Sequence, residues 1–261
     1  MCFPNYSLNL PSPTMQRYFN INYEFDIPTV RRRLDERVRE GRPGYICVAD
    51  GNILQMVHKD LDYRKTVDGA MFSICDSSWV PVYLDKLYGF KPEQYCGSHI
   101  FAEVTGMRKY RQIFLGTDRP TLEALRTNMS RRDPKISGMK FIDLPYRAVE
   151  DFDYQSIADM VNSDGADIIW VALGAPKQER FMQRLEPYLE RGVMIGVGAV
   201  FKFFSGVGEK RAPKWMVAAH LEFVYRIFRE PGKQLRRCRD ILFTLPAIIR
   251  EERNNNLSLE K

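Results

Sequence analysis

The stretches ADIIWVALG (166–174), APKQERFMQRLEPYLERG (175–192) and GVMIGVGAV (192–200) follow one another directly and decide the fold. The first and last are apolar runs of strand length. The middle one repeats apolar residues at the spacing of a helix, which we expect Gly192 to end. A strand, a helix and a strand in this order predict a right-handed β-α-β unit in a parallel sheet.

The same alternation precedes this unit. The apolar runs YICVAD (45–50), AMFSIC (70–75) and RQIFLG (111–116) are each followed by a helical pattern. We therefore expect an α/β fold over residues 1–205, with a Rossmann-like, mostly parallel sheet and helices on both faces. A basic helical appendage is expected over residues 206–261.

The composition is that of a soluble globular protein, because 44% of the 261 residues are apolar and 28% are charged. The first residues lack the pattern of a secretory signal, and no apolar run approaches the ~20 residues that cross a bilayer, so we expect a cytoplasmic location. The five cysteines include no C-x-x-C pair. Cys47 and Cys75 lie in apolar runs, which favours buried thiols over a zinc site or a disulfide.

The positive charge is concentrated at the C-terminal end. The chain has a net charge of +6, and residues 202–261 alone hold 13 Lys and Arg against 7 Asp and Glu. The preceding residues are therefore neutral overall. This asymmetry indicates an anionic partner for the appendage, such as phospholipid head groups, a polyphosphate or nucleic acid.

The turn that follows the run 166–174 has features of a ligand site. In open α/β sheets, ligands bind beyond the carboxyl ends of the strands, where helix N-termini present N–H groups. Gly174 would let a ligand approach the backbone, Pro176 would set the start of the helix, and Gln178 could offer both a donor and an acceptor. An ordinary strand-to-helix turn with a solvated first helical turn (177–180) explains the spacing equally well.

An ordered set of motifs is more specific. DIIWVALGAPKQERFM, GVGAVFKFFSG and RAPKWMVAAHLEFVYRIFREPGKQLRR occur in this order, preceded by DSSWVPVYLDKLYG, FLGTDRPTLEAL and LPYRAVEDFD. Over residues 45–240 the chain thereby resembles the WecG/TagA/CpsF glycosyltransferase family. The resemblance implies transfer of a sugar, often of the N-acetylmannosamine type, from a UDP donor to a polyprenyl-diphosphate-linked saccharide at the inner membrane face. It implies no cofactor.

Asp76 is the predicted general base. An inverting transfer needs a carboxylate within reach of the acceptor hydroxyl, and Asp76 directly follows the apolar run 70–75. The resemblance implies the same role, although the family has Gly where this chain has Ser77. The alternative is that Asp76 caps a helix beginning near Trp79.

The resemblance implies further site residues. The catalytic set is Asp76, Gln178, Arg226 and Arg236. The substrate-binding set is Asp50, Gly116, Tyr146, Gly174, Lys202, Arg211 and Lys233. Departures from the family concern Val48 and Asp50 in place of its T-x-N segment, Lys202 in place of an acid, and Lys233 in place of an arginine. These departures leave the donor sugar open.

No metal site is expected. The pairs Asp60-Leu61-Asp62 and Asp151-Phe152-Asp153 do not follow buried strands, so we interpret them as solvated surface. The histidines share no ligand spacing. Cations of the appendage would then stabilise the departing UDP, since guanidinium groups bind phosphate oxygens bidentately.

The appendage also has an apolar stripe suited to a membrane surface, although Pro246 is expected to kink or restart its helix. The stripe consists of Leu235, Ile241, Leu242, Phe243, Leu245, Ile248 and Ile249. A dimer seam is the competing interpretation, so homo-oligomerisation stays open, and no nucleic-acid partner is expected.

Two other functions are alternatives to sugar transfer. A nucleotide-dependent oxidoreductase would need a G-x-G-x-x-G turn, which the sequence lacks. A catalytically degenerate protein that only binds membrane surfaces is conceivable because of Val48, Ser77 and Lys202.

Overall fold

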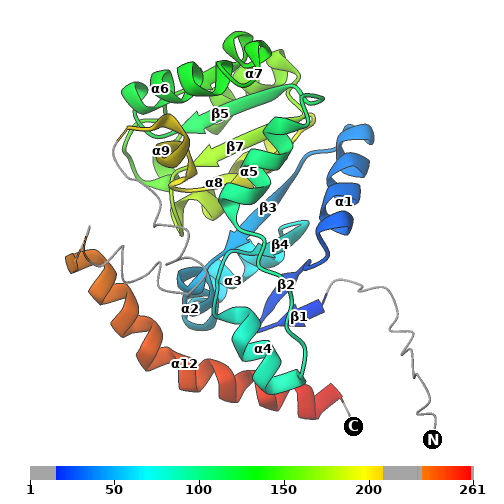
Figure 1. The fold of residues 1–261 in the computed structure, drawn as a ribbon, viewed down its shortest axis with the longest axis vertical. Coiled ribbons are helices and arrows are strands. Elements are labelled where there is room, and N and C mark those ends of the chain that lie inside the picture. Colours follow the sequence, from blue (N-terminus) through cyan, green and yellow to red (C-terminus); the bar gives the residue numbers. More distant parts are fainter. Residues whose placement is uncertain (1–15, 208–227, 229–230, 260–261) are drawn as a thin grey trace, which may run out of the picture.

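The computed structural model describes residues 16–207, 228 and 231–259. Its strands form one eight-stranded sheet in the order β1-β2-β4-β3-β8-β7-β5-β6 (Figure 1). The strands are β1 Gln16–Tyr18, β2 Ile21–Tyr23, β3 Gly44–Ala49, β4 Phe72–Cys75, β5 Gln112–Gly116, β6 Lys140–Ile142, β7 Ile168–Ala172 and β8 Val193–Gly196. All neighbouring pairs are parallel except β1 with β2. The predicted fold class is confirmed.

The helices connect these strands. They are α1 Ile27–Arg39, α2 Gly51–Lys59, α3 Leu61–Asp68, α4 Val80–Tyr88, α5 Gly97–Gly106, α6 Arg119–Ser130, α7 Tyr154–Asp164, α8 Lys177–Leu185, α9 Val200–Ser205 and α12 Pro231–Leu259. Short 3-10 helices are η1 Pro134–Gly138, η2 Val149–Asp151 and η3 Glu186–Tyr188.

Alternate residues of each strand face opposite layers of helices, as the strand period of two requires. In β3, Ile46 and Val48 join one core cluster with residues of α1, α5, α6 and α9. Tyr45 and Cys47 join a second cluster with residues of α7 and α8. The sheet is therefore covered on both faces, as predicted, and the buried thiols predicted for Cys47 and Cys75 are confirmed.

Two helices differ from the predicted ranges. The helix expected to reach Gly192 ends at Leu185 and continues only as η3, because Pro187 lacks the N–H that a longer α-helix would use. The continuous helical pattern after β3 is divided into α2 and α3, because the Asp60 side chain accepts hydrogen bonds from Asp62 N and Tyr63 N and so caps a new helix.

The appendage helix α12 packs against the α/β part of the chain. Figure 1 shows it (orange to red) running beside α2 and past α4. Ile248 is 4% exposed and belongs to a core cluster with Val57 and Leu84. The helix does not restart at Pro246, which lies within one element of 29 residues.

The predicted apolar stripe of α12 is therefore divided between two environments. Ile248 is part of the protein core, so its placement in a membrane-facing stripe is wrong. The exposed members are Leu235, Leu242 and Phe243, at 55%, 69% and 77% exposure. No helix in the described ranges has the length and apolar character of a membrane span.

Candidate active site

The carboxyl ends of the parallel strands bring predicted site residues to one edge of the sheet, here termed the carboxyl edge. Asp50 follows β3, Asp76 follows β4, Gly116 ends β5 and Gly174 lies just beyond β7. The first two are direct neighbours, since Asp76 N donates to Ala49 O at 3.0 Å. This arrangement is the site position that open α/β sheets favour.

Asp76 is held from two sides by a distant loop. Its Oδ1 accepts from Gly97 N, the first residue of α5, at 2.9 Å, and its backbone oxygen accepts from Gln94 Nε2 at 2.7 Å. The first N–H groups of the following helix donate to the neighbouring Ser77 Oγ, from Trp79 N at 3.3 Å and from Val80 N at 3.4 Å, whereas the Asp76 carboxylate accepts from the start of α5. Ser77 has no positive φ, so this turn does not need the freedom of glycine. The carboxylate is thereby fixed at the carboxyl edge.

Asp50 lies where the appendage crosses this edge. Its Oδ1 accepts from Asn52 N and Ile53 N at 3.0 Å each, which caps α2. A Cβ added at the adjacent Gly51 would lie 3.3 Å from Ile241 Cδ1. The helix α12 therefore passes directly over the start of α2, next to the Asp50 loop.

Gln178 joins two loops of the carboxyl edge. Its Oε1 accepts from Gly174 N at 3.2 Å and from Gly198 N at 3.0 Å, and its Nε2 donates to Glu179 Oε1 at 2.8 Å. The side chain is 4% exposed. The sequence analysis expected the amide of Gln178 to offer a donor and an acceptor to a ligand. In the structure Oε1 and Nε2 both bond within the protein. Gln178 therefore acts on the candidate site by holding the two glycine loops.

Glu179 is a candidate site residue that the sequence analysis missed. It is fully buried, and its Oε2 accepts from Tyr63 OH at 3.0 Å. The pKa of Glu179 is raised to about 7, mainly by burial and in smaller part by nearby Asp50, while the hydrogen bonds from Gln178 and Tyr63 act to lower it. The interpretation of 177–180 as a solvated turn is therefore wrong for Gln178 and Glu179. The helical spacing did hold a signal for the burial of Gln178, because this residue lies one helical turn before the apolar Met182 and so shares its face.

The helix α9, which follows β8, brings a cation close to the loop after β5. Lys202 is exposed on α9 and lies near Asp118. The pKa of Asp118 is below its usual range, mainly because Thr121 N donates to its carboxylate and in smaller part because of the charge of Lys202.

Gly116, at the end of β5, lies very close to the neighbouring strand. A Cβ added at Gly116 would come within 2.7 Å of Ala172 O, and the φ of Gly116 is +105°. Gly116 is therefore required for the close approach of β5 to β7.

Tyr146 and the half-buried Lys177 form a pair near the start of α8. Tyr146 is fully exposed, and Lys177 Nζ lies 5.2 Å from the centre of its ring. An aromatic face beside a cation suits a planar ligand that carries phosphate.

The predicted cations of the appendage are only partly within the described residues. Arg236 is exposed on α12, five residues before the Ile241 contact, a rise of ~7.5 Å along a helix. Lys233 lies in the first turns of the same helix. Arg211 and Arg226 lie outside the described residues.

One member of each acidic pair considered for a metal caps a helix. Asp60 caps α3 and pairs with Arg180 at 2.6 Å, and Asp153 accepts from Ser156 N to cap α7. Within residues 16–207 and 231–259, no group of three or more His, Cys, Asp or Glu side chains is arranged to hold a metal ion.

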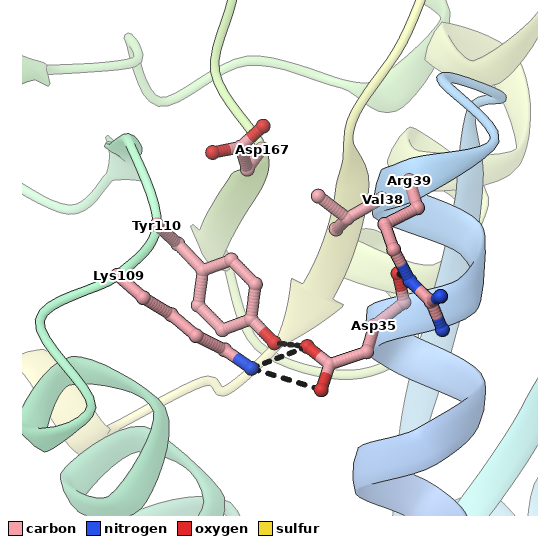
Figure 2. Close-up of a pocket in the computed structure, with 6 residues that line it drawn as sticks. All are labelled: Asp35, Val38, Arg39, Lys109, Tyr110 and Asp167. Carbon is pink, nitrogen blue, oxygen red and sulfur yellow. Dashed lines mark hydrogen bonds and ion pairs between the residues drawn. The ribbon is translucent and has the colours of Figure 1, made fainter.

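A cavity of about 350 Å³ lies at the opposite edge, where β5 and β7 begin (Figure 2). Lys109 Nζ donates to both Asp35 oxygens, at 2.6 and 2.8 Å, and Tyr110 OH donates to one of them. Although burial opposes it, these bonds hold the pKa of Asp35 below its usual range. The charges of Asp35 and Lys109 are engaged with each other, and we assign this cavity no part in the site.

Comparison with known proteins adds independent information. A family model described as "Glycosyl transferase WecG/TagA/CpsF family" matches residues 18–258. A protein of Bacillus subtilis (strain 168), named N-acetylglucosaminyldiphosphoundecaprenol N-acetyl-beta-D-mannosaminyltransferase, is 27% identical over 88% of this chain and 91% of its own length. A protein of the same name from Bacillus spizizenii is 27% identical over 82% of each chain.

Proposed function

The chain belongs to the WecG/TagA/CpsF family of glycosyl transferases, and on this premise we propose its reaction. It transfers a hexose or N-acetylhexosamine, of the N-acetylmannosamine type, from a UDP-sugar to a polyprenyl-diphosphate-linked saccharide in cell-surface polysaccharide synthesis. The names of the two Bacillus relatives, which specify an N-acetylmannosaminyl group and an undecaprenol-diphosphate acceptor, support this proposal. The observation that carries it is the fixed Asp76 carboxylate at the carboxyl edge.

In the proposed mechanism, Asp76 takes the proton of the acceptor hydroxyl as its oxygen attacks the anomeric carbon. The bond from that carbon to UDP breaks, and its electron pair leaves with the diphosphate. Attack opposite the leaving group inverts the anomeric centre. Asp76 keeps its hydrogen bond from Gly97 N, which holds the carboxylate in place during the step.

Cations rather than a metal ion stabilise the departing UDP in this proposal. Lys202 lies at the carboxyl edge, and Arg236 lies on the helix that crosses it. Arg211, Arg226 and Lys233 complete the proposed cationic set, and Asp50, Gly174 and Tyr146 border the proposed donor site. Arginine can donate two parallel hydrogen bonds to a diphosphate.

The acceptor is lipid-linked, so we place the enzyme peripherally on the inner face of the plasma membrane, with residues 206–261 as the membrane-associating part. The exposed apolar side chains of α12 and the basic charge of this segment support that location.

Mass spectrometry of the lipid-linked product formed from a panel of UDP-sugars tests the proposed function. We expect a mass gain of one sugar residue together with release of UDP, and little change in rate when EDTA is added. Strict dependence on Mg²⁺ or Mn²⁺ would contradict the metal-independent mechanism. Vesicle binding without a product from any donor would favour the catalytically degenerate alternative.

The two roles of α12 are expected to separate by mutation. Replacing Leu242 and Phe243 by Ser should abolish sedimentation with anionic vesicles while preserving turnover on a short-chain soluble acceptor, because both side chains are exposed and make no core contact. Arg236→Ala should do the reverse and lower turnover on the soluble acceptor about tenfold through loss of a charge-assisted hydrogen bond. Equal effects of both changes on both measurements would contradict separate roles.

A further inference from the structure

Three buried side chains form a chain of hydrogen bonds from α3 to the carboxyl edge. Tyr63 OH donates to Glu179 Oε2 at 3.0 Å, and Gln178 Nε2 donates to Glu179 Oε1 at 2.8 Å. Gln178 Oε1 then accepts from the N–H groups of Gly174 and Gly198. The last two residues belong to the loops that follow β7 and β8.

The partners determine which way the Gln178 amide points. Both glycine groups are N–H donors, so the atom that faces them must be Oε1, and Nε2 must face Glu179. A rotated amide would direct its NH₂ group at two donors. The fit is close, because a Cβ at Gly196 would lie 3.1 Å from Gln178 Nε2. The Glu179 carboxylate, as the acceptor for Nε2, and the two glycine N–H groups, as donors to Oε1, therefore favour the same orientation of Gln178.

We propose that Glu179 is a positioning residue, which fixes the loops after β7 and β8 relative to each other by orienting Gln178. The role rests on the proposed function, because these loops border the proposed donor site. Gly174 and Gly198 have φ values of +76° and +56°, and a Cβ at Gly198 would lie 4.0 Å from Gly174 Cα. The two loops are thus in close contact, and one shared acceptor atom connects them.

A merely structural role would be to join α3 and α8. Thr66 Oγ1 donates to Gln183 Oε1 at 2.7 Å and joins the same two helices without touching Gln178. Thr66→Val is therefore a matched control, since it removes a hydrogen bond between α3 and α8 but leaves the orientation of Gln178 unchanged.

Amide hydrogen exchange measured by NMR tests the proposal without relying on activity. In Glu179→Leu, exchange at Gly174 and Gly198 should accelerate at least about tenfold, because Gln178 loses the acceptor that orients it. Glu179→Gln, which can still present an oxygen to Gln178, should stay near the wild-type rate, as should Thr66→Val. If Glu179→Leu does not fold, Tyr63→Phe should show faster exchange at both glycines than Thr66→Val. If Glu179→Leu folds and the exchange rates of both glycines are unchanged, the proposal is overturned. If it does not fold, unchanged rates in Tyr63→Phe overturn the proposal.

Turnover provides the second measurement. Glu179→Leu should lower kcat about tenfold, with recovery in Glu179→Gln and no loss in Thr66→Val. An equal loss in Glu179→Leu and Thr66→Val would show that the contact is only structural. If the wild type transfers no sugar, the proposed function fails, whereas the exchange result still decides whether Glu179 positions the loops.

Discussion

Replacing Asp76 by Asn is expected to lower turnover by ~10²- to 10⁴-fold while UDP-sugar binding changes little, because an amide cannot take the proton of the acceptor hydroxyl. The substitution preserves the structure around the site. An asparagine oxygen can still accept from Gly97 N, which is the contact that Asp76 Oδ1 makes at 2.9 Å. A loss of rate therefore reports the loss of the base and not the release of α5.

Asp26→Asn is a matched control for this experiment. Like Asp76, Asp26 is a carboxylate that accepts a hydrogen bond from a backbone N–H in the first turn of a helix, here from Thr29 N at 2.9 Å, but it precedes α1 and lies outside the proposed site. Its turnover should equal that of the wild type. Single-turnover rates and calorimetry of UDP binding separate the two quantities, and an Asp76→Asn enzyme within a few-fold of the wild-type rate would contradict the assignment of the base.

The free energy of unfolding of the wild type is expected to fall by about 3 kcal/mol more than that of Glu179→Gln when the pH rises from 4 to 8, because Glu179 ionises in this range. Burial raises the pKa of Glu179 from an ordinary value of 4.5 to about 7. Below pH 4.5 the carboxyl is protonated in both the folded and the unfolded chain, and its contribution to stability is fully present. As the pH rises to 7, the unfolded chain releases this proton first, so that contribution is lost.

The groups that face Glu179 act in both directions, because the hydrogen bonds from Gln178 and Tyr63 lower its pKa and a neighbouring charge raises it. Asp50 at the start of α2 raises the pKa of Glu179. Cys47 and Tyr45 on β3 and Tyr63 on α3 lie in the same surroundings, and the Glu179 charge in turn contributes to raising their pKa values. Retaining a carboxyl at a position where its charge destabilises the fold is typical of functional sites.

Urea unfolding of the wild type and Glu179→Gln across this pH range measures the difference directly. Carboxylates elsewhere in the chain titrate in both proteins, so their effects cancel in the comparison. Glu190→Gln, at an exposed position, controls for the loss of one acidic side chain. A difference between wild type and Glu179→Gln that stays constant with pH would contradict a raised pKa at Glu179.

The fold class could be predicted because its signals are local. The apolar runs that became β3, β4, β5, β7 and β8 and the helical patterns between them lie in continuous segments. Parallel strands place their carboxyl ends at one edge, so the positions of Asp50, Asp76 and Gly174 followed from the order of these segments.

Only the tertiary structure decided what these side chains contact. The partner of Asp76 is Gly97, 21 residues away, and that of Glu179 is Tyr63, 116 residues away. Local patterns offered a cap on the next helix as the alternative for Asp76, and a solvated first helical turn as the alternative for residues 177–180. They could not show these contacts, because Gly97 and Tyr63 belong to other helices.

The appendage shows the same division. The sequence by itself determined a basic helix with apolar residues, since charge and composition need no knowledge of neighbours. The tertiary structure decided that Ile248 is buried in the core while Leu242 and Phe243 are exposed. The periodicity of a helix shows which residues share a face. The surface that each face meets depends on elements distant in the sequence, and in this protein α2 and α4 cover the buried face of α12.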